Sequence, residues 1–302
     1  MLFSPSRQAE ARRQTDLYFN PPLERVGMLA WKRFAHIVAQ GHAHAVATLS
    51  ALQLGDFPLE PAPSPAHASR FRQPRASTMK IYYHPASTVS RPVMMFIEDN
   101  AVAVDFQLVD IFTGEHMGAA FGTVNPSHLV PVLEEDGFRL TESSAILKYI
   151  ADTIDSPAYP KDLRQRARVN EMMDWINTQL CRDLAYGTVY AQIFPGHKRP
   201  GDEAQRVTVA WGQERAKTWM KVLDEKLLGS DKAYLCGDTI TIADYYGASF
   251  VHLAEVIGSD LSAYPNVDAW LKRMKARPTW DKVYATINGF ASQIPKGQLA
   301  TV

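Results

Sequence analysis

The spacing of apolar residues changes along the chain, and the change falls near residue 155. Before it, short apolar runs alternate with helical segments in the order strand, helix, strand, helix, strand, strand, helix. We expect the strands at 81–83, 105–110, 131–133 and 138–140. The first helix is expected to open at Ser90, with Ser90 as its cap and Pro92 in its first turn. Residues 79–154 therefore form an α/β domain with a helix after most strands.

After residue 154 the pattern becomes almost entirely helical. Residues 155–161 contain two prolines and read as a linker between domains. Apolar residues then recur every three to four positions, which predicts helices over 162–184, 203–228, 245–257 and, with breaks, 261–290. We expect a break between Gly187 and Gly201. Residues 162–290 are thus an all-α domain, followed by a tail at 291–302.

One of these helices carries a start signal of its own. Thr241 and Asp244 have the spacing of a capping box, with aspartate in place of the usual glutamate or glutamine. Its expected role is in folding rather than in chemistry.

Residues 1–78 differ from the rest of the chain. They hold nine Lys and Arg against five Asp and Glu, which leaves 23 against 27 for residues 79–302. Residues 23–54 contain a plausible amphipathic helix, and the prolines that follow predict an irregular, poorly ordered tether. Charged residues occupy the place of a signal peptide's apolar core, and Met79 is a credible native start.

Composition excludes several classes of function. The 32 basic residues balance the 32 acidic residues, which favours neither a nucleic acid nor a membrane surface as partner. No apolar run approaches the roughly 20 residues that span a membrane. The two cysteines, Cys181 and Cys236, lie far apart with no metal-binding spacing, so we expect no metal and a cytoplasmic location.

The most informative stretch is Asn125 to Ser144, NPSHLVPVLEEDGFRLTESS. Val130 precedes Pro131 at the mouth of a strand, where proline belongs at an edge, a turn or a cis bond. Glu142 and Ser143 stand at the start of the helix that follows. Backbone N–H groups at a helix start have no partner within the helix, so they favour a carboxylate ligand.

This arrangement resembles the glutathione-binding site of the glutathione transferases, and the theta class in particular. The resemblance covers residues 79–290, which implies a thioredoxin-like domain followed by the helical domain. It implies reduced glutathione as co-substrate, with Val130 and Pro131 at its cysteinyl part and Glu142 and Ser143 at its γ-glutamyl end. It also implies a homodimer.

Conjugation requires a thiolate, and a free thiol with a pKa of about 8.5 is mostly protonated near neutrality. The donor that stabilises the thiolate must lie in the loop between the first strand and the first helix. In theta enzymes a serine is followed four residues later by an arginine, which matches Ser87 and Arg91. Thr88, Ser90 and two tyrosines, Tyr82 and Tyr83, are the neighbouring alternatives.

His116 matches the theta histidine that reaches the glycine end of glutathione. The family often has a lysine just before the Val-Pro unit, whereas this chain has Leu129. Arg91 or His128 would have to compensate for that missing cation.

The electrophile is expected between the loop at 85–86 and the first helices of the second domain, near Tyr186, Tyr190 and Trp211. Cys181 or Arg182 would stand close to the thiol. The function implied is conjugation of glutathione to a small hydrophobic or halogenated electrophile, with glutathione-dependent dehalogenation as one subtype. The alternative is a glutathione-binding or scaffolding protein of this fold with little activity. A thiol oxidoreductase fits the domain order but lacks a cysteine near residue 87 or 90.

Overall fold

The computed structural model describes residue 43 and residues 79–302, and the described residues 79–302 lie within one compact unit. The helix and tether that we predict within residues 1–78 fall outside the described residues.

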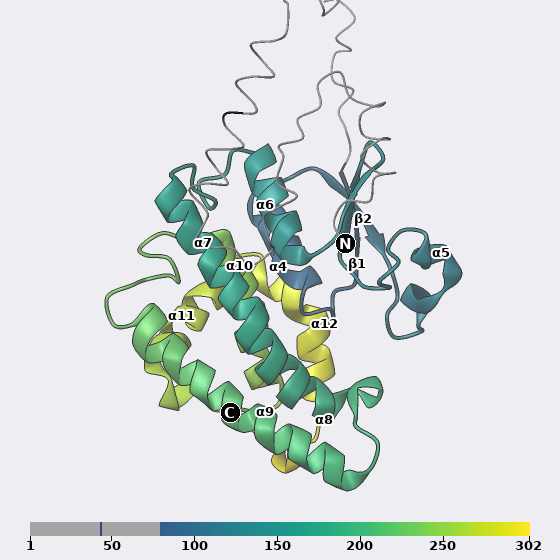
Figure 1. Ribbon diagram of the computed structural model, residues 1–302, viewed down its shortest axis with the longest axis vertical. Coiled ribbons are helices and arrows are strands. Elements are labelled where there is room, and N and C mark those ends of the chain that lie inside the picture. The colour runs from purple at the N-terminus through teal and green to yellow at the C-terminus, as the bar shows by residue number, and fades with distance from the viewer. Residues whose placement is uncertain (1–42, 44–78) are drawn as a thin grey trace, which may run out of the picture. The chain divides into compact units, whose positions relative to one another are not determined.

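The α/β part is built on a four-stranded mixed sheet in the order β2-β1-β3-β4 (Figure 1). The two inner strands are β1 (Met79–Tyr83) and β3 (Val132–Glu135), which pair antiparallel, with Ile81 opposite Leu133. At the edges, β2 (Val104–Leu108) runs parallel to β1 and β4 (Phe138–Leu140) runs antiparallel to β3. The helical segments between and after the strands are α4 (Ser90–Asp99), η2 (Glu115–Met117), α5 (Ala119–Gly122) and α6 (Ser143–Thr153). The predicted thioredoxin-like order is confirmed.

The hairpin before α6 is tighter than the sequence suggests. The strands predicted at 131–133 and 138–140 leave residues 134–137 for the turn, but Glu134 and Glu135 belong to β3 and pair with β4. Only Asp136 and Gly137 turn, both with positive φ (48° and 84°). A two-residue hairpin turn needs this backbone because it matches the twist of the strands.

The second part is all helical. Its longest run comprises α7 (Leu163–Trp175), the π-helix η3 (Ile176–Tyr190) and α8 (Ala191–Ile193), followed by the short η4 (Pro195–His197). The remaining helices are α9 (Asp202–Val222), η5 (Leu223–Leu228), α10 (Ile242–Val256), η6 (Leu261–Ala263), α11 (Pro265–Lys275), α12 (Trp280–Ser292) and η7 (Lys296–Gln298).

The predicted break between Gly187 and Gly201 is present, but it begins only at Phe194, because the helical run continues through Gly187 to Ile193. Glycine is required at this position for packing rather than for a turn. A Cβ atom on Gly212 of α9 would lie 2.5 Å from the carbonyl carbon and oxygen of Gly187. Two glycines therefore let α9 and η3 cross in backbone contact, a reason that only the folded structure reveals.

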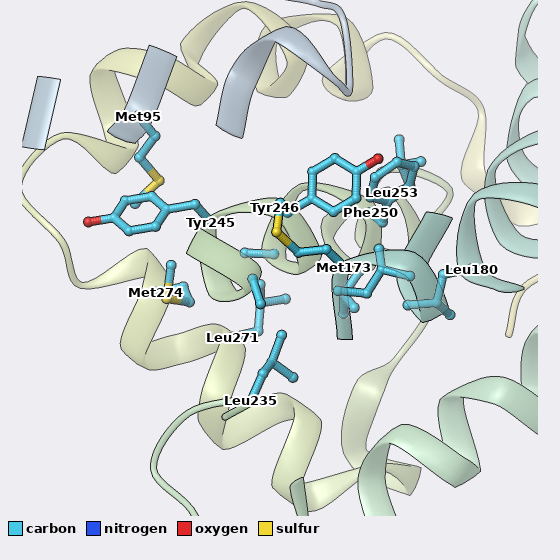
Figure 2. Close-up of a cluster of buried hydrophobic side chains, with 14 of the residues drawn as sticks. Met95, Met173, Leu180, Leu235, Tyr245, Tyr246, Phe250, Leu253, Leu271 and Met274 are labelled. Atoms are coloured by element: carbon cyan, nitrogen blue, oxygen red, sulfur yellow. The ribbon is translucent and has the colours of Figure 1, made fainter. Parts of the chain in front are cut away.

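Both parts share one hydrophobic core, with α10 at its centre. Every residue of α10 except Glu255 is buried. Around it lie Met95 from α4, Met173 from α7, Leu180 from η3 and Leu271 from α11 (Figure 2). This common packing fixes the helices that face the loop after β1.

The end of the chain is also packed. Gln192 exchanges two hydrogen bonds with the backbone of Ala300, and the Ser259 hydroxyl accepts one from the Val302 amide. The predicted tail at 291–302 thus begins as the last turn of α12 and ends against α8 and the turn after α10.

Candidate functional site

The loop between β1 and α4 presents Ser87. Its backbone amide donates to the carbonyl of His84 (3.0 Å), and its carbonyl accepts from the amides of Ser90 and Arg91 (both 3.2 Å). The Ser87 Oγ accepts from the Ser90 amide at 3.3 Å. Ser87 therefore caps α4 with its oxygen, and within the described chain no acceptor takes its hydroxyl proton.

The prediction that Ser90 caps α4 is wrong. Ser90 is the first residue inside α4, and the position before the helix is Val89, which has no capping side chain. The Ser90 hydroxyl is buried and has no partner among the described residues. A hydroxyl in the first helical turn cannot reach the N–H groups that a residue just outside the helix can satisfy.

Buried side chains hold the loop on its inner side. The Tyr190 hydroxyl donates to Thr88 Oγ1 (2.7 Å), and the Ser249 hydroxyl donates to the Thr88 carbonyl. Arg91 Nη1 donates to the carbonyl of Ala86 at 2.8 Å. The loop is thus anchored by η3, α10 and α4, and Thr88 is occupied as a partner of Tyr190.

Arg91 is fully enclosed, with 0% of its surface exposed. Its guanidinium lies over the ring of Tyr284 (5.2 Å to the centroid), while its Nε and Nη2 atoms have no described partner. Burial lowers the pKa of this guanidinium. Because no part of it reaches the surface, Arg91 is not placed to replace the missing lysine.

The stretch at 125–144 forms the outer wall of the site. The Val130–Pro131 bond is cis, and Val130 lines the adjoining cavity. Glu142 stands just before α6 with positive φ (64°) and makes no capping hydrogen bond. Ser143, the first residue of α6, is buried. Burial raises the pKa of Tyr246 in α10, and a hydrogen bond with the Ser143 side chain offsets part of this effect.

Two histidines lie at the same wall. The Nδ1 atom of His128 makes a 2.7 Å hydrogen bond with the carbonyl of His116, so this nitrogen carries a proton. His116 has a buried Nδ1 without a described partner. Both histidines line the cavity together with Leu129, which is 56% exposed.

The cavity in front of Ser87 has a volume of about 360 Å³, within the range of small-molecule sites. Sequence reasoning correctly places Tyr186 and Tyr190 along it, but Trp211 lies elsewhere, exposed on α9. Four further rings line the cavity: Phe112, Phe194, His197 and Phe250. Sequence reasoning missed them because they come from a loop, a helix end, a short 3₁₀ turn and a buried helix.

The other residues considered near the thiol position are not placed to activate it. Cys181 lines the cavity, but burial and the nearby Glu142 carboxylate raise the pKa of its thiol to about 11, which keeps it protonated. The Arg182 side chain donates two hydrogen bonds to Asp183 and does not line the cavity. Tyr83 packs edge-on against Phe106, and Tyr82 against Phe121, both away from the cavity.

Among the described residues, no group of three or more His, Cys, Asp or Glu side chains is arranged to hold a metal ion. Over the same residues, no helix combines the length and the apolar character needed to cross a bilayer.

Comparison with known proteins gives consistent matches. The family model described as "Glutathione S-transferase, N-terminal domain" matches residues 86–153, and "Glutathione S-transferase, C-terminal domain" matches residues 192–278. Glutathione S-transferase theta-1 from Homo sapiens is 30% identical over 203 residues, which is 66% of this chain and 82% of the relative. The theta-1 protein from Mus musculus is 31% identical over the same shares.

Solved structures agree with these matches. The apo form of human glutathione S-transferase T1-1 superposes with a TM-score of 0.62 at 27% identity, over 73% of this chain and 93% of that one. Human glutathione transferase theta-2, in complex with glutathione and an unknown ligand, gives 0.62 at 26% identity, over 74% and 93%.

Proposed function

Because the chain belongs to the glutathione S-transferase family, with theta-class members among its relatives, we propose that it conjugates reduced glutathione to a hydrophobic electrophile through Ser87. The observation that carries this proposal is the state of the Ser87 hydroxyl. Its oxygen is fixed by the Ser90 amide, and its proton is left for a ligand in the cavity.

The energetic requirement is modest. Lowering the pKa of a thiol by two units needs about 2.7 kcal/mol of preferential stabilisation of the anion. A hydrogen bond from a hydroxyl to a thiolate supplies a large part of this. The N-terminal end of α4, which has no acidic residue in its first turn, adds a favourable field.

Glutathione would lie along the wall formed by residues 125–144. In the proposed arrangement the backbone of Val130, next to Pro131, pairs with the cysteinyl part. The start of α6, at Glu142 and Ser143, holds the γ-glutamyl end, whose carboxylate suits the free N–H groups of a helix start. His116 meets the glycyl end.

The reaction that follows is a substitution. The glutathione thiolate attacks an electrophilic carbon, a C–S bond forms, and the leaving group departs with the electron pair of its bond. The proton of the thiol goes to solvent. Five phenylalanine and tyrosine rings and three histidine rings around the cavity favour a planar aromatic electrophile. A small haloalkane would contact few of these rings, so the geometry lends no support to a dehalogenase.

The test is the Ser87→Ala variant, assayed with glutathione and 1-chloro-2,4-dinitrobenzene. We expect kcat/KM to fall about 100-fold, and the pKa of bound glutathione, followed by thiolate absorbance, to rise by about two units. Ser90→Ala is the matched control, because the Ser90 hydroxyl has no partner to lose. Unchanged turnover by Ser87→Ala with several electrophiles would exclude Ser87 as the donor.

One observation favours a second candidate, a glutathione-binding protein with little activity. Leu129 is exposed where the family often has a lysine, so the glycyl carboxylate lacks a cation there. Retention on glutathione resin combined with no thiolate absorbance would favour this candidate.

Dimerisation is a further part of the proposal. Apolar side chains that are about half exposed, Phe138 of β4 and Trp211 of α9, lie on the two parts of the chain that we expect to meet in a homodimer. Sedimentation of the full chain at the mass of one copy would exclude it.

A further inference from the structure

The peptide unit immediately before Ser87 is held from both sides by buried side chains. The Ala86 amide donates to Nδ1 of His84 (3.1 Å), and the Ala86 carbonyl accepts from Nη1 of Arg91 (2.8 Å). His84 is only 5% exposed and Arg91 is fully buried. The orientation of Ser87 therefore depends on a peptide whose two polar groups are both bound by side chains.

These two contacts differ in one chemical respect. A guanidinium donates at every ordinary pH, whereas an imidazole nitrogen accepts a hydrogen bond only when it carries no proton. The Ala86 contact thus requires neutral His84 with its proton on Nε2. If Nδ1 takes up a proton, two N–H donors face each other and the contact is lost.

The groups around His84 define its charge state. Its Nε2 lies 3.9 Å from Asp110 Oδ1, and its ring meets Phe112 edge-on at 4.9 Å. The Asp110 carboxylate is itself held by the amides of Phe112 and Thr113, and the Glu115 carboxylate accepts from the Asp110 amide.

His116 and Asp110 act on His84 in opposite directions. Burial, the largest influence, lowers the pKa of His84, His116 lowers it further, and Asp110 raises it in part. Arg91, a buried cation, lies on the carbonyl side of Ala86. The neutral form of His84 is therefore favoured in the folded chain. The contact is intact above the ordinary histidine pKa of about 6.5 and is lost as the pH falls through the lowered value.

We propose that His84 is a positioning residue whose unprotonated Nδ1 holds the Ala86 peptide so that Ser87 faces the cavity, and that its protonation releases this loop. The inference rests on the proposed role of Ser87. Under this proposal, acid reduces activity in two ways: it protonates the glutathione thiol, and it protonates His84.

The chain offers a matched pair of variants. In His84→Asn, the side-chain oxygen can accept from the amide two residues further on, as in an Asx turn, and it does not titrate in this range. In His84→Leu no acceptor remains. His84 does not line the cavity, so neither substitution changes the cavity lining itself.

The first measurement is kcat/KM for glutathione in the full chain, with 1-chloro-2,4-dinitrobenzene, between about pH 5 and pH 8. We expect wild type to lose activity in acid with a logarithmic slope approaching about 2, one proton from the thiol and one from His84. His84→Asn should keep activity within about threefold of wild type at pH 7.5, with a slope of about 1. His84→Leu should lose about tenfold at every pH, with KM for the electrophile unchanged.

The second measurement does not depend on catalysis. In the full chain labelled with ¹⁵N-alanine, the Ala86 amide resonance is assigned by its absence in Ala86→Gly. We expect it to shift with a single pKa below about 6.5 in wild type and to stay still in His84→Asn.

The two readouts separate the possible failures. The role of His84 would be overturned if His84→Asn kept transferase activity with the same slope of about 2 in acid, or if the Ala86 resonance in wild type did not shift with pH. Either outcome would leave the proposed function intact. Absence of turnover in wild type would overturn the proposed function, and the Ala86 resonance would still decide whether His84 controls the loop. Should His84→Leu fail to fold, His84→Asn and the wild-type titration suffice.

Discussion

The start of α6 and the start of α10 have similar residue types, but only the start of α10 is capped by side chains. α6 begins at Ser143, directly after Thr141 and Glu142, whereas α10 begins at Ile242, directly after Thr241, and carries Asp244 in its first turn. At α10 the predicted capping box is confirmed, with both reciprocal bonds present. At α6 the residue before the helix has positive φ and no capping bond.

The start of α10, which we call the closed end, is occupied by hydrogen bonds from the protein itself. The Asp244 carboxylate accepts from the Thr241 amide and hydroxyl, the Leu235 amide and the Trp270 indole, at 2.7 to 2.9 Å. Burial raises the pKa of this carboxyl, and the four donors offset part of that effect. Such an end stabilises the fold and has nothing left for a ligand. At the start of α6, which we call the open end, Glu142 makes no capping hydrogen bond. A helix start without a cap can receive a carboxylate ligand.

Removing the closed end should have the largest effect. Asp244→Ala leaves four buried donors without an acceptor, so we expect the free energy of unfolding to fall by about 4 kcal/mol. Urea unfolding of the full chain measures this, with Asp244→Asn as the smaller perturbation. A loss below about 1 kcal/mol would show that the capping box does not support the fold.

Removing the Ser143 hydroxyl at the open end should affect binding more than stability. For Ser143→Ala we expect the Kd for glutathione to rise about tenfold, because a hydrogen bond to a charged ligand group is lost. Titration calorimetry gives the value, and Ser144→Ala, one position further along α6, is the control. An equal effect of both variants would mean that Ser143 acts through helix stability alone.

The backbone before α6 offers a third contrast. Glu142→Gly should raise the free energy of unfolding by about 1 kcal/mol, since glycine adopts positive φ without strain. It should weaken glutathione binding at the same time. The equivalent change at the closed end, Thr241→Gly, should lower stability instead. Thermal unfolding distinguishes these signs, and a loss of stability in Glu142→Gly would contradict the contrast.

The smallest expected effect is a gain. Leu129→Lys adds a cation at an exposed position of the cavity wall, so we expect the Kd for glutathione to fall about threefold at low salt and the gain to shrink as salt is added. Leu129→Gln controls for the loss of the apolar side chain. An affinity independent of salt would mean that no carboxylate lies near this position.

Much of the architecture could be predicted because it depends on neighbours in sequence. The order of strands and helices, the start of α6 at Ser143 and the capping box at Thr241 follow from local spacing, and each is present. Ser87 was placed in the correct loop, although its role in catalysis remains a prediction. The errors concern which of two nearby residues provides a cap and how two helices pack. Ser87 rather than Ser90 provides the capping oxygen, and Gly187 continues its helix and packs against Gly212.

The cavity shows the same limit more clearly. Phe112, Phe194 and Phe250 come from three separate segments, and nothing in the sequence indicates that they meet. The sequence suggests that Arg91 could bind the glycyl carboxylate of glutathione, but the structure shows that Arg91 is fully buried. Burial and proximity are properties of packing, and spacing along the chain does not encode them.

The sequence by itself determined which helix starts carry acids and hydroxyls, since capping depends on residues within one turn. Only the tertiary structure decided which of these ends would be closed and which left open. Asp244 accepts hydrogen bonds from Leu235 and Trp270, so the start of α10 is occupied, whereas Glu142 before α6 makes no capping hydrogen bond and lies near Cys181 of the cavity lining. The physical reason is that a polar group is available to a ligand only if no other part of the fold has already satisfied it.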